Sequence, residues 1–160
     1  MQELREAQRL DAALSLAYRR IARRDRTSAE IEQLLRERDV DELTLAATID
    51  ELTELGYLDD ARYAVRFTSD RRLLDGWGSV RIERRLRELG VARELIAAAL
   101  ERCDDEQSEL DAAVEQLRRR FPEPPRTARD QRRAVEMLMR RGYGRELAHD
   151  ALRRLEAGDC

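Results

Sequence analysis

The sequence contains no lysine and few aromatic residues: one tryptophan, four tyrosines and two phenylalanines among 160 residues. So low an aromatic content, together with the lack of β-branched runs, argues against a β-sandwich. Because lysine is absent, all 31 residues of the lysine and arginine class are arginine. Arginine binds carboxylates and phosphates through two-point contacts that lysine cannot reproduce, so any basic surface here has that geometry.

Long apolar runs are missing as well. The longest, LIAAAL at residues 95–100, is far too short to cross a bilayer, and the opening MQELREAQRL lacks the apolar core of a signal peptide. The two cysteines, Cys103 and Cys160, are not in a metal-binding or redox spacing. We therefore expect a cytoplasmic protein that has no membrane contact and binds no metal or cofactor.

Signals for catalysis are weak. The single histidine, His149, falls in a predicted helix, where a surface position is favoured over a catalytic role. Asp59 and Asp60 are adjacent at a helix start and point in different directions, which favours capping over metal binding. No glycine-rich phosphate loop precedes a lysine, since the chain has no lysine. We expect the protein not to be an enzyme.

The chain is rich in charge and in helix-forming residues. Charged residues make up 41% of it and apolar residues 42%, which is enough to fold. Alanine, leucine, glutamate and arginine dominate, so we predict an all-α fold. The net charge of −3 argues against a uniformly basic nucleic-acid binder. Residues 62–87 and 118–145 are nevertheless basic and residues 101–115 acidic, which indicates distinct charged faces.

An internal repeat organises the sequence. The segments SAEIEQLLRERDV and SVRIERRLRELGV align at an offset of 51 residues, and DQRRAVEMLMRRGY aligns at a further 52. The apolar positions agree, so Leu35, Leu86 and Leu138 should be buried in equivalent places. We therefore predict three tandem three-helix repeats stacked into an elongated array. Their predicted bounds are residues 1–56, 57–103 and 104–160.

Capping and breaking residues place the helices within each repeat. In the first repeat, TSAE at residues 27–30 is a capping box that opens the middle helix. In the second repeat, Asp59 is the predicted N-cap of the first helix, whose inner side should carry Ala64, Phe67 and Leu74. In the third, the prolines of FPEPP at residues 121–125 separate the first helix from the middle one.

Three stretches resemble one known family. GYLDDARYA at residues 56–64 and RRLLDGWGSVRIERRLRELGV at residues 71–91 resemble the RecX regulatory family, small helical proteins that modulate the RecA recombinase. ALSLAYRRIARRDRTSAEIEQLLRERDV at residues 13–40 resembles the opening segment of that family. The family commonly has glycine where this chain has Asp39, and aspartate tolerates the left-handed conformation needed there. The resemblance covers nearly all of residues 11–157.

The resemblance implies a function and a partner. A three-repeat helical array of this family would lie in the groove of a RecA filament on single-stranded DNA. There it would limit filament growth, the linked ATPase and strand exchange, without catalysing a reaction itself. The implied partner is RecA or its filament, with a weak contact to DNA left open and no cofactor. We expect the chain to act as a monomer.

Arginines recur near the end of the first helix of each repeat, and Arg20 and Arg71 are equivalent in register. They either complement the helix dipole or align into a ladder that faces an acidic groove or phosphates. On the second interpretation, Arg71, Arg72, Arg81 and Arg84 would share one positive face. The candidate partner-binding residues are Arg20, Arg71, Arg72, Trp77, Arg81, Arg84 and Arg85.

Trp77 has two interpretations of its own. It either packs over a helix corner or is an exposed anchor, because tryptophan and arginine are enriched in interface hot spots. Gly76 and Gly78 flank it and are expected to leave the ring without a rigid backbone frame. Two rival functions also remain for the whole chain: a direct single-stranded nucleic-acid-binding protein, and a generic helical interaction scaffold.

Overall fold

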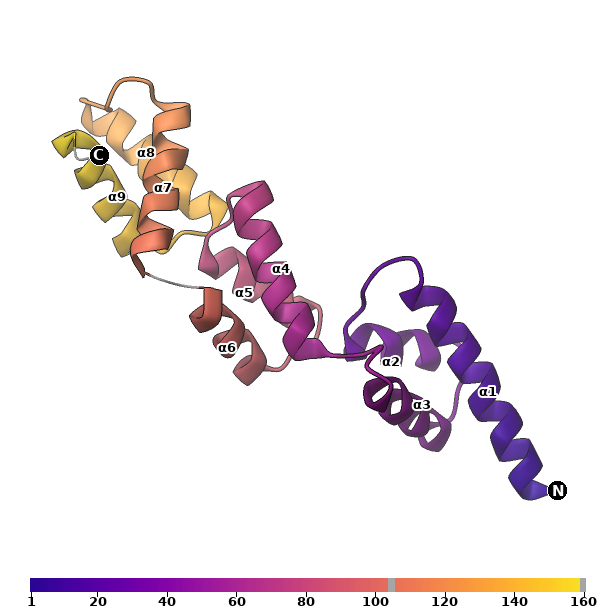
Figure 1. The fold of residues 1–160 in the computed structure, drawn as a ribbon. Helices are drawn as coiled ribbons and strands as arrows, with labels where there is room; N and C mark the ends of the chain where they lie inside the picture. Colours follow the sequence, from indigo (N-terminus) through magenta and orange to yellow (C-terminus); the bar gives the residue numbers. More distant parts are fainter. Residues whose placement is uncertain (104–105, 159–160) are drawn as a thin grey trace. The chain divides into compact units, whose positions relative to one another are not determined.

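The computed structural model describes residues 1–103 and 106–158, and within these ranges it contains nine helices and no strand (Figure 1). The prediction of an all-α fold is confirmed. The helices are α1 (Gln2–Ile21), α2 (Ser28–Arg36), α3 (Glu42–Glu54), α4 (Asp60–Asp75), α5 (Ser79–Glu88), α6 (Arg93–Cys103), α7 (Glu106–Arg120), α8 (Ala128–Arg141) and α9 (Arg145–Ala157). Two of the acidic residues in the band at 101–115, Asp104 and Asp105, lie outside the described residues, as does Cys160.

The helices fall into three tandem groups of three, as the 51- and 52-residue offsets predict. Leu35, Leu86 and Leu138 lie on the middle helix of each group and are all fully buried. Burial also repeats on the third helix of each group, where the equivalent residues Leu45, Ile96 and Ala148 are buried. The repeat seen in the sequence is therefore a repeat of the structure. We refer to α1–α3, α4–α6 and α7–α9 as the first, second and third repeats.

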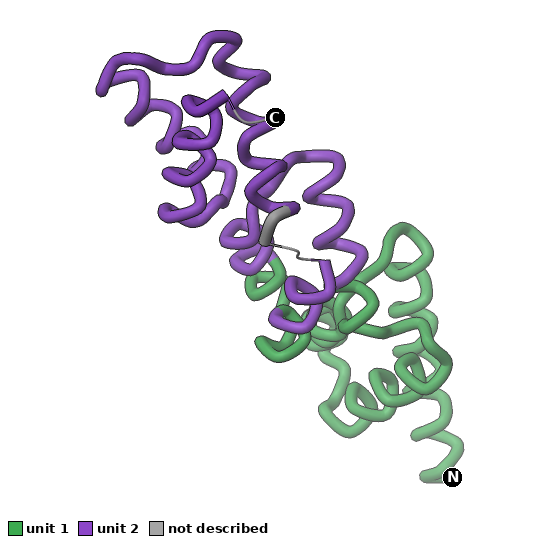
Figure 2. Tube along the Cα trace, turned by 60° about the vertical axis from the view of Figure 1, so that its left-hand side comes forward, with its two compact units in different colours: residues 1–64, 86–96 green, residues 65–85, 97–160 purple. Residues whose placement is uncertain are grey.

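The chain divides into two compact units (Figure 2). Unit 1 contains residues 1–64 and 86–96, and unit 2 contains residues 65–85 and 97–160. The division passes through α4, α5 and α6, so each unit combines one terminal repeat with part of the second repeat. The domain bounds at residues 56 and 103 stay predictions.

Each unit has its own apolar core. In unit 1, α1 packs against α2 and α3, and the core contains Ala13, Ala17, Ile31, Leu35, Leu45, Leu52 and Leu58. In unit 2, α7 packs against α8 and α9, and residues of all three helices are buried together, among them Leu117, Leu138 and Leu152. These cores are formed by the apolar residues that recur in the sequence at helical spacing.

The predicted helix starts are confirmed. Thr27 and Glu30 form a capping box at the start of α2, in which each side chain accepts a hydrogen bond from the other residue's backbone N–H. The side chain of Asp59 accepts a 2.9 Å hydrogen bond from the backbone N–H of Arg62, which makes it the N-cap of α4. The FPEPP segment lies between α7 and α8 and contains no helix.

One predicted inward residue of α4 is wrong. Leu74 is 77% exposed, whereas Phe67 is partly buried as expected. The inner stripe of α4 runs through Ala64, which is buried as predicted, and continues four residues apart through Thr68 and Arg72. Leu74 follows Arg72 by two positions, which turns it to the opposite side of the helix. A half-buried arginine therefore occupies the place that an apolar residue was expected to fill.

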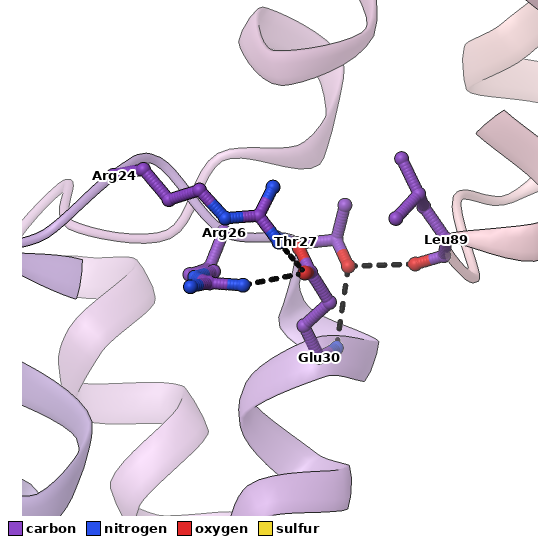
Figure 3. A network of polar contacts seen from close by, with 5 residues as sticks. All are labelled: Arg24, Arg26, Thr27, Glu30 and Leu89. Carbon is purple, nitrogen blue, oxygen red and sulfur yellow. Dashed lines mark hydrogen bonds and ion pairs between the residues drawn. The ribbon is translucent and has the colours of Figure 1, made fainter. Parts of the chain in front are cut away.

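The start of each of the first two middle helices contacts a turn that lies far ahead in the sequence. In unit 1, the hydroxyl of Thr27 donates a 2.6 Å hydrogen bond to the carbonyl oxygen of Leu89 (Figure 3). In unit 2, the N–H of Gly78 donates a 3.0 Å hydrogen bond to the carbonyl oxygen of Arg141. Because Thr27 and Gly78 are 51 residues apart, and Leu89 and Arg141 are 52 apart, the two contacts are equivalent in register.

A carboxylate caps these same two helix starts. The backbone N–H of Ser28 donates to Asp60 at 2.8 Å within unit 1, and the backbone N–H of Ser79 donates to Glu109 at 2.8 Å within unit 2. A negative charge at a helix N-terminus interacts favourably with the helix dipole and satisfies a free N–H. The capping role predicted for Asp60 is thus seen, although the helix that it caps is α2.

The left-handed turn after each middle helix explains the aspartate at position 39. Asp39, Gly90 and Gly142 all have positive φ, at 56°, 79° and 96°. A Cβ atom on Gly90 would lie 2.3 Å from the Cβ of Ala29, and one on Gly142 would lie 2.2 Å from the Cβ of Arg81. In the second and third repeats, glycine is therefore required both by the positive φ and by the lack of room for a Cβ atom. Asp39 is exposed, so at this position only the positive φ has to be tolerated, as the sequence predicts.

Candidate partner-binding site

Two arginines lie against the ring of Trp77, in the turn between α4 and α5. The guanidinium carbon of Arg81 is 4.0 Å from the centroid of the indole ring, and that of Arg71 is 5.6 Å from it. Both distances are within the range of cation–π attraction. Trp77 itself is partly buried, so the indole has both packed and solvent-facing surface.

Phe67 completes an aromatic pair at this site. Its ring lies 6.2 Å from that of Trp77 at an interplanar angle of 70°, an edge-to-face arrangement. Arg71 lies one helical turn after Phe67 and places its guanidinium 5.3 Å from the phenyl centroid. Arg71 also forms an ion pair with Asp75, one turn further along α4. We call Phe67, Arg71, Trp77 and Arg81 the Trp77 cluster.

The backbone of the turn is held firmly, contrary to the expectation that its glycines leave it free. The N–H of Trp77 donates a 3.1 Å hydrogen bond to the carbonyl oxygen of Arg71. The phenol of Tyr143 donates a 3.1 Å hydrogen bond to the carbonyl oxygen of Gly76. A Cβ atom on Gly78 would lie 2.4 Å from the carbonyl oxygen of Gly142. The glycines therefore serve close packing, and the ring has a rigid frame.

Tyr143 supplies that frame from a buried position in unit 2. Burial, and then the negative charge of Glu109, raise the pKa of the Tyr143 phenol to about 12. The phenol is therefore protonated at neutral pH and can donate to Gly76. Sequence reasoning missed this residue because the two partners are 67 positions apart.

Arg72 is placed differently from its neighbour Arg71. Its guanidinium is half-buried and donates a 2.7 Å hydrogen bond to the carbonyl oxygen of Cys103 and a 2.8 Å hydrogen bond to the hydroxyl of Ser79. These bonds link the end of α4 to the end of α6 and the start of α5. Arg72 therefore holds the helices of unit 2 together, and its charge is directed into the protein.

The remaining predicted site residues are exposed. Arg84 and Arg85 lie on α5, about one turn beyond Arg81, whereas Arg20 lies on α1 in unit 1. The structure thus brings Arg71, Trp77 and Arg81 together from the predicted set and adds Phe67 to them. The partner-binding role of these residues stays a prediction.

In the described part of the chain, the histidine, aspartate and cysteine residues considered for catalysis or metal binding are not gathered into a site. His149 is exposed on α9, and Asp59 and Asp60 cap α4 and α2 respectively. Cys103 is partly buried, with its sulfur 3.8 Å from the carbonyl oxygen of Val65. Among the described residues, no group of three or more histidine, cysteine, aspartate or glutamate side chains is placed to hold a metal ion. Nor is any helix within the described ranges long and apolar enough to span a membrane.

These features define a class: an all-α protein of three tandem three-helix repeats, with an arginine–aromatic cluster at the turn between the first two helices of its second repeat. Residues 59–100 match the second three-helix domain of RecX, and residues 107–152 match the third. The chain belongs to the RecX family of regulatory proteins.

Relatives and solved structures agree with this assignment. The chain is 36% identical to the regulatory protein RecX of Mycolicibacterium vanbaalenii, over 89% of this chain and 81% of the relative. It is 34% identical to the regulatory protein RecX of Deinococcus radiodurans, over 93% of this chain and 70% of the relative. The crystal structure of RecX from Lactobacillus salivarius superposes with a TM-score of 0.82 at 21% identity, covering 94% of this chain and 99% of that one. A second crystal structure of a regulatory protein RecX gives a TM-score of 0.76 at 22% identity, over 92% and 73%. The last two likenesses concern the fold alone.

Proposed function

We propose that this protein is a non-enzymatic regulator that binds the RecA filament on single-stranded DNA and limits its growth, its ATPase activity and strand exchange. Membership of the RecX family supports the regulatory role. The observation that carries the binding role is the Trp77 cluster. In this proposal the protein acts as a monomer in the cytoplasm, without a cofactor.

The Trp77 cluster has the chemistry of a binding hot spot. Tryptophan and arginine are the residues most enriched where truncation costs an interface most. Arg71 and Arg81 lie against aromatic rings, and this contact restricts their side chains before any partner arrives. A guanidinium held in this way loses less conformational entropy on binding, while its N–H groups still match a carboxylate or phosphate. A recombinase filament on DNA offers both kinds of acceptor.

Arg84 and Arg85 extend this basic surface along α5 in the proposal. Both are exposed, and both lie in the basic band at residues 62–87. Arg20 is proposed as an equivalent contact of the first repeat, on the basis of its register with Arg71. Exposed arginines of this kind affect mainly the association rate and its salt dependence.

Direct binding of single-stranded nucleic acid is the second candidate function. The pairing of Phe67 and Trp77, both partly buried, beside two arginines favours it, since bases stack on aromatic rings and arginine contacts the phosphates. The net charge of −3 opposes it, because such binders normally carry a broad positive groove.

The test is titration of the purified protein into a single-stranded-DNA-dependent ATPase assay of RecA. We expect ATP hydrolysis to fall as protein is added, with little binding to the same DNA when RecA is absent. Tight, strongly salt-dependent binding to DNA alone would support the nucleic-acid-binding alternative. If ATP hydrolysis is unchanged at saturating protein and no DNA is bound, both functions are excluded, and the protein is a generic helical interaction scaffold.

A further inference from the structure

A second surface lies in the third repeat, between α8 and α9 of unit 2. It is an open groove of about 850 Å³ whose apolar lining includes Val135, Met139 and Leu152. Met139 is 37% exposed there, and a methionine side chain is flexible enough to fit different partner surfaces. None of these residues belongs to the Trp77 cluster.

The internal repeat shows that the apolar residues on the α8 side of the groove are specific to the third repeat. Val135 and Met139 correspond to Glu83 and Arg87 in the second repeat and to Glu32 and Arg36 in the first. Glu32 and Arg36 form an exposed ion pair across one helical turn, with 3.4 Å between nitrogen and oxygen. In place of that solvated pair of opposite charges the third repeat has two apolar residues, of which Val135 is buried at the floor of the groove and Met139 is exposed in it.

The charges along the groove have one predominant sign. Arg132, Arg140 and Arg145 line it and are exposed, and Glu136 is the one acidic residue of the lining. Glu136 lies 4.0 Å from Arg140. Arg132 and Arg145 form no ion pair within the part of the chain that the structure describes. The groove thus combines an apolar lining with positive charge that the protein does not neutralise.

We propose that the α8–α9 groove is a docking site for an amphipathic helix of a partner protein, with an apolar stripe against Met139 and acidic residues on its flanks. Helix-in-groove recognition needs an apolar groove and matching charge at its edges, and both are present here. The lining of α8 runs from Ala128 to Arg140, a length of about 18 Å at 1.5 Å per residue, which suits a partner segment of about three turns. The proposal does not depend on RecA being the partner.

The binding test uses two labelled synthetic helical peptides with the same leucine stripe. One carries glutamate at every flanking position and the other carries lysine. Fluorescence anisotropy should show that the glutamate peptide binds the full chain at least about tenfold more tightly than the lysine peptide. Substitution of Arg132 and Arg145 together by alanine should remove most of that preference.

Three variants locate the binding. Met139→Gln should lower the affinity for the glutamate peptide by about tenfold, as expected for loss of an interface anchor. The charge-neutral pair Val135→Glu with Met139→Arg, which copies the first two repeats, should do the same. Leu43→Gln, at an 86% exposed leucine of the first repeat, should leave affinity unchanged. Circular dichroism checks that each variant is folded. Because Val135 is buried, the double variant at Val135 and Met139 can fail to fold, and Met139→Gln is then the decisive variant.

Several results would overturn the proposal. Absence of peptide binding, equal binding of both peptides, or full binding by Met139→Gln would each do so. Competition by oligothymidylate would show that the groove binds nucleic acid. A dimer in sedimentation that Met139→Gln dissociates would assign the groove to a second copy of the chain. None of these outcomes bears on the RecA assay, since the Trp77 cluster is unchanged in every variant.

Discussion

The hydroxyl of Thr27 donates a 2.6 Å hydrogen bond to the carbonyl oxygen of Leu89, although 62 positions separate the two residues (Figure 3). The hydroxyl oxygen of Thr27 also accepts a 3.2 Å hydrogen bond from the backbone N–H of Glu30. Thr27 is fully buried, so both bonds are shielded from water. A single hydroxyl therefore caps α2 and holds the turn that follows α5.

Thr27→Val should destabilise the protein by about 2–4 kcal/mol. Loss of an N-cap typically costs about 1 kcal/mol, and leaving the buried Leu89 carbonyl without its donor costs about 1–3 kcal/mol more. Thr127→Val is the matched control, because exposed Thr127 caps α8 through the backbone N–H of Asp130. Urea unfolding measures both. Equal costs for the two valine variants would show that the bond to Leu89 contributes nothing.

Gly90→Ala should be more costly than Gly56→Ala, although the two glycines have almost the same φ, 79° and 77°. At Gly56 nothing lies within 4 Å of an added Cβ, so only the left-handed conformation is penalised, by about 1–2 kcal/mol. At Gly90 the Cβ would also overlap Ala29, which adds about 1–3 kcal/mol for overpacking. Denaturant unfolding of the two variants gives the difference. A difference near zero would contradict the close approach of Gly90 to Ala29 at the start of α2.

Trp77→Ala should destabilise the protein by about 2 kcal/mol, below the ~3–5 kcal/mol of a fully buried aromatic residue, because the indole is partly buried. Trp77 is the only tryptophan, so its fluorescence reports on this site alone. The emission maximum of the parent should lie between those of hydrated and fully buried indole. An emission typical of hydrated indole, with an unchanged Tm in Trp77→Ala, would show that the ring does not pack at this corner.

Stability should fall at alkaline pH because of Tyr143. Its pKa is about 12 in the folded protein and about 10 in the unfolded chain, so the folded state holds this proton more tightly. The stabilisation is complete below pH about 10 and is lost as the pH rises through about 12. Tyr143→Phe should lack this loss of stability, which denaturant unfolding at a series of pH values measures. The same alkaline slope in parent and variant would contradict the assigned pKa.

The repeats and most helix starts were predictable because local spacing determines them. Leu35, Leu86 and Leu138 recur at fixed offsets, and Thr27 and Asp59 precede their helices with the residues that capping needs. The position of Leu74 was not predictable in this way, because the inner stripe of α4 includes a half-buried arginine. That arginine finds its acceptors on Ser79 and Cys103, which lie in other helices.

The candidate site was predictable only in part, for a similar reason. Arg71, Trp77 and Arg81 are close in sequence, so their clustering follows from one turn. The rigidity of that turn depends on Tyr143 and Gly142, which belong to the next repeat. The groove beside Met139 did leave a signal in the sequence, because the 52-residue offset sets Met139 against Arg87. The signal is an apolar residue at a repeat position where the other repeats have a charged residue.

The proposed binding of the RecA filament by the Trp77 cluster is tested by the ATPase titration repeated with Arg71→Glu and Arg81→Glu combined. Arg72 is left unchanged because its inward hydrogen bonds support the fold. Arg5→Glu with Arg9→Glu, at exposed sites near the start of α1, makes the same charge change away from the cluster. Charge reversal at a contact turns attraction into repulsion, so we expect the cluster variant to lose most of its inhibition while keeping its Tm within a few degrees. The control variant should inhibit as the parent does. Full inhibition by the folded cluster variant would show that the Trp77 cluster does not bind the filament.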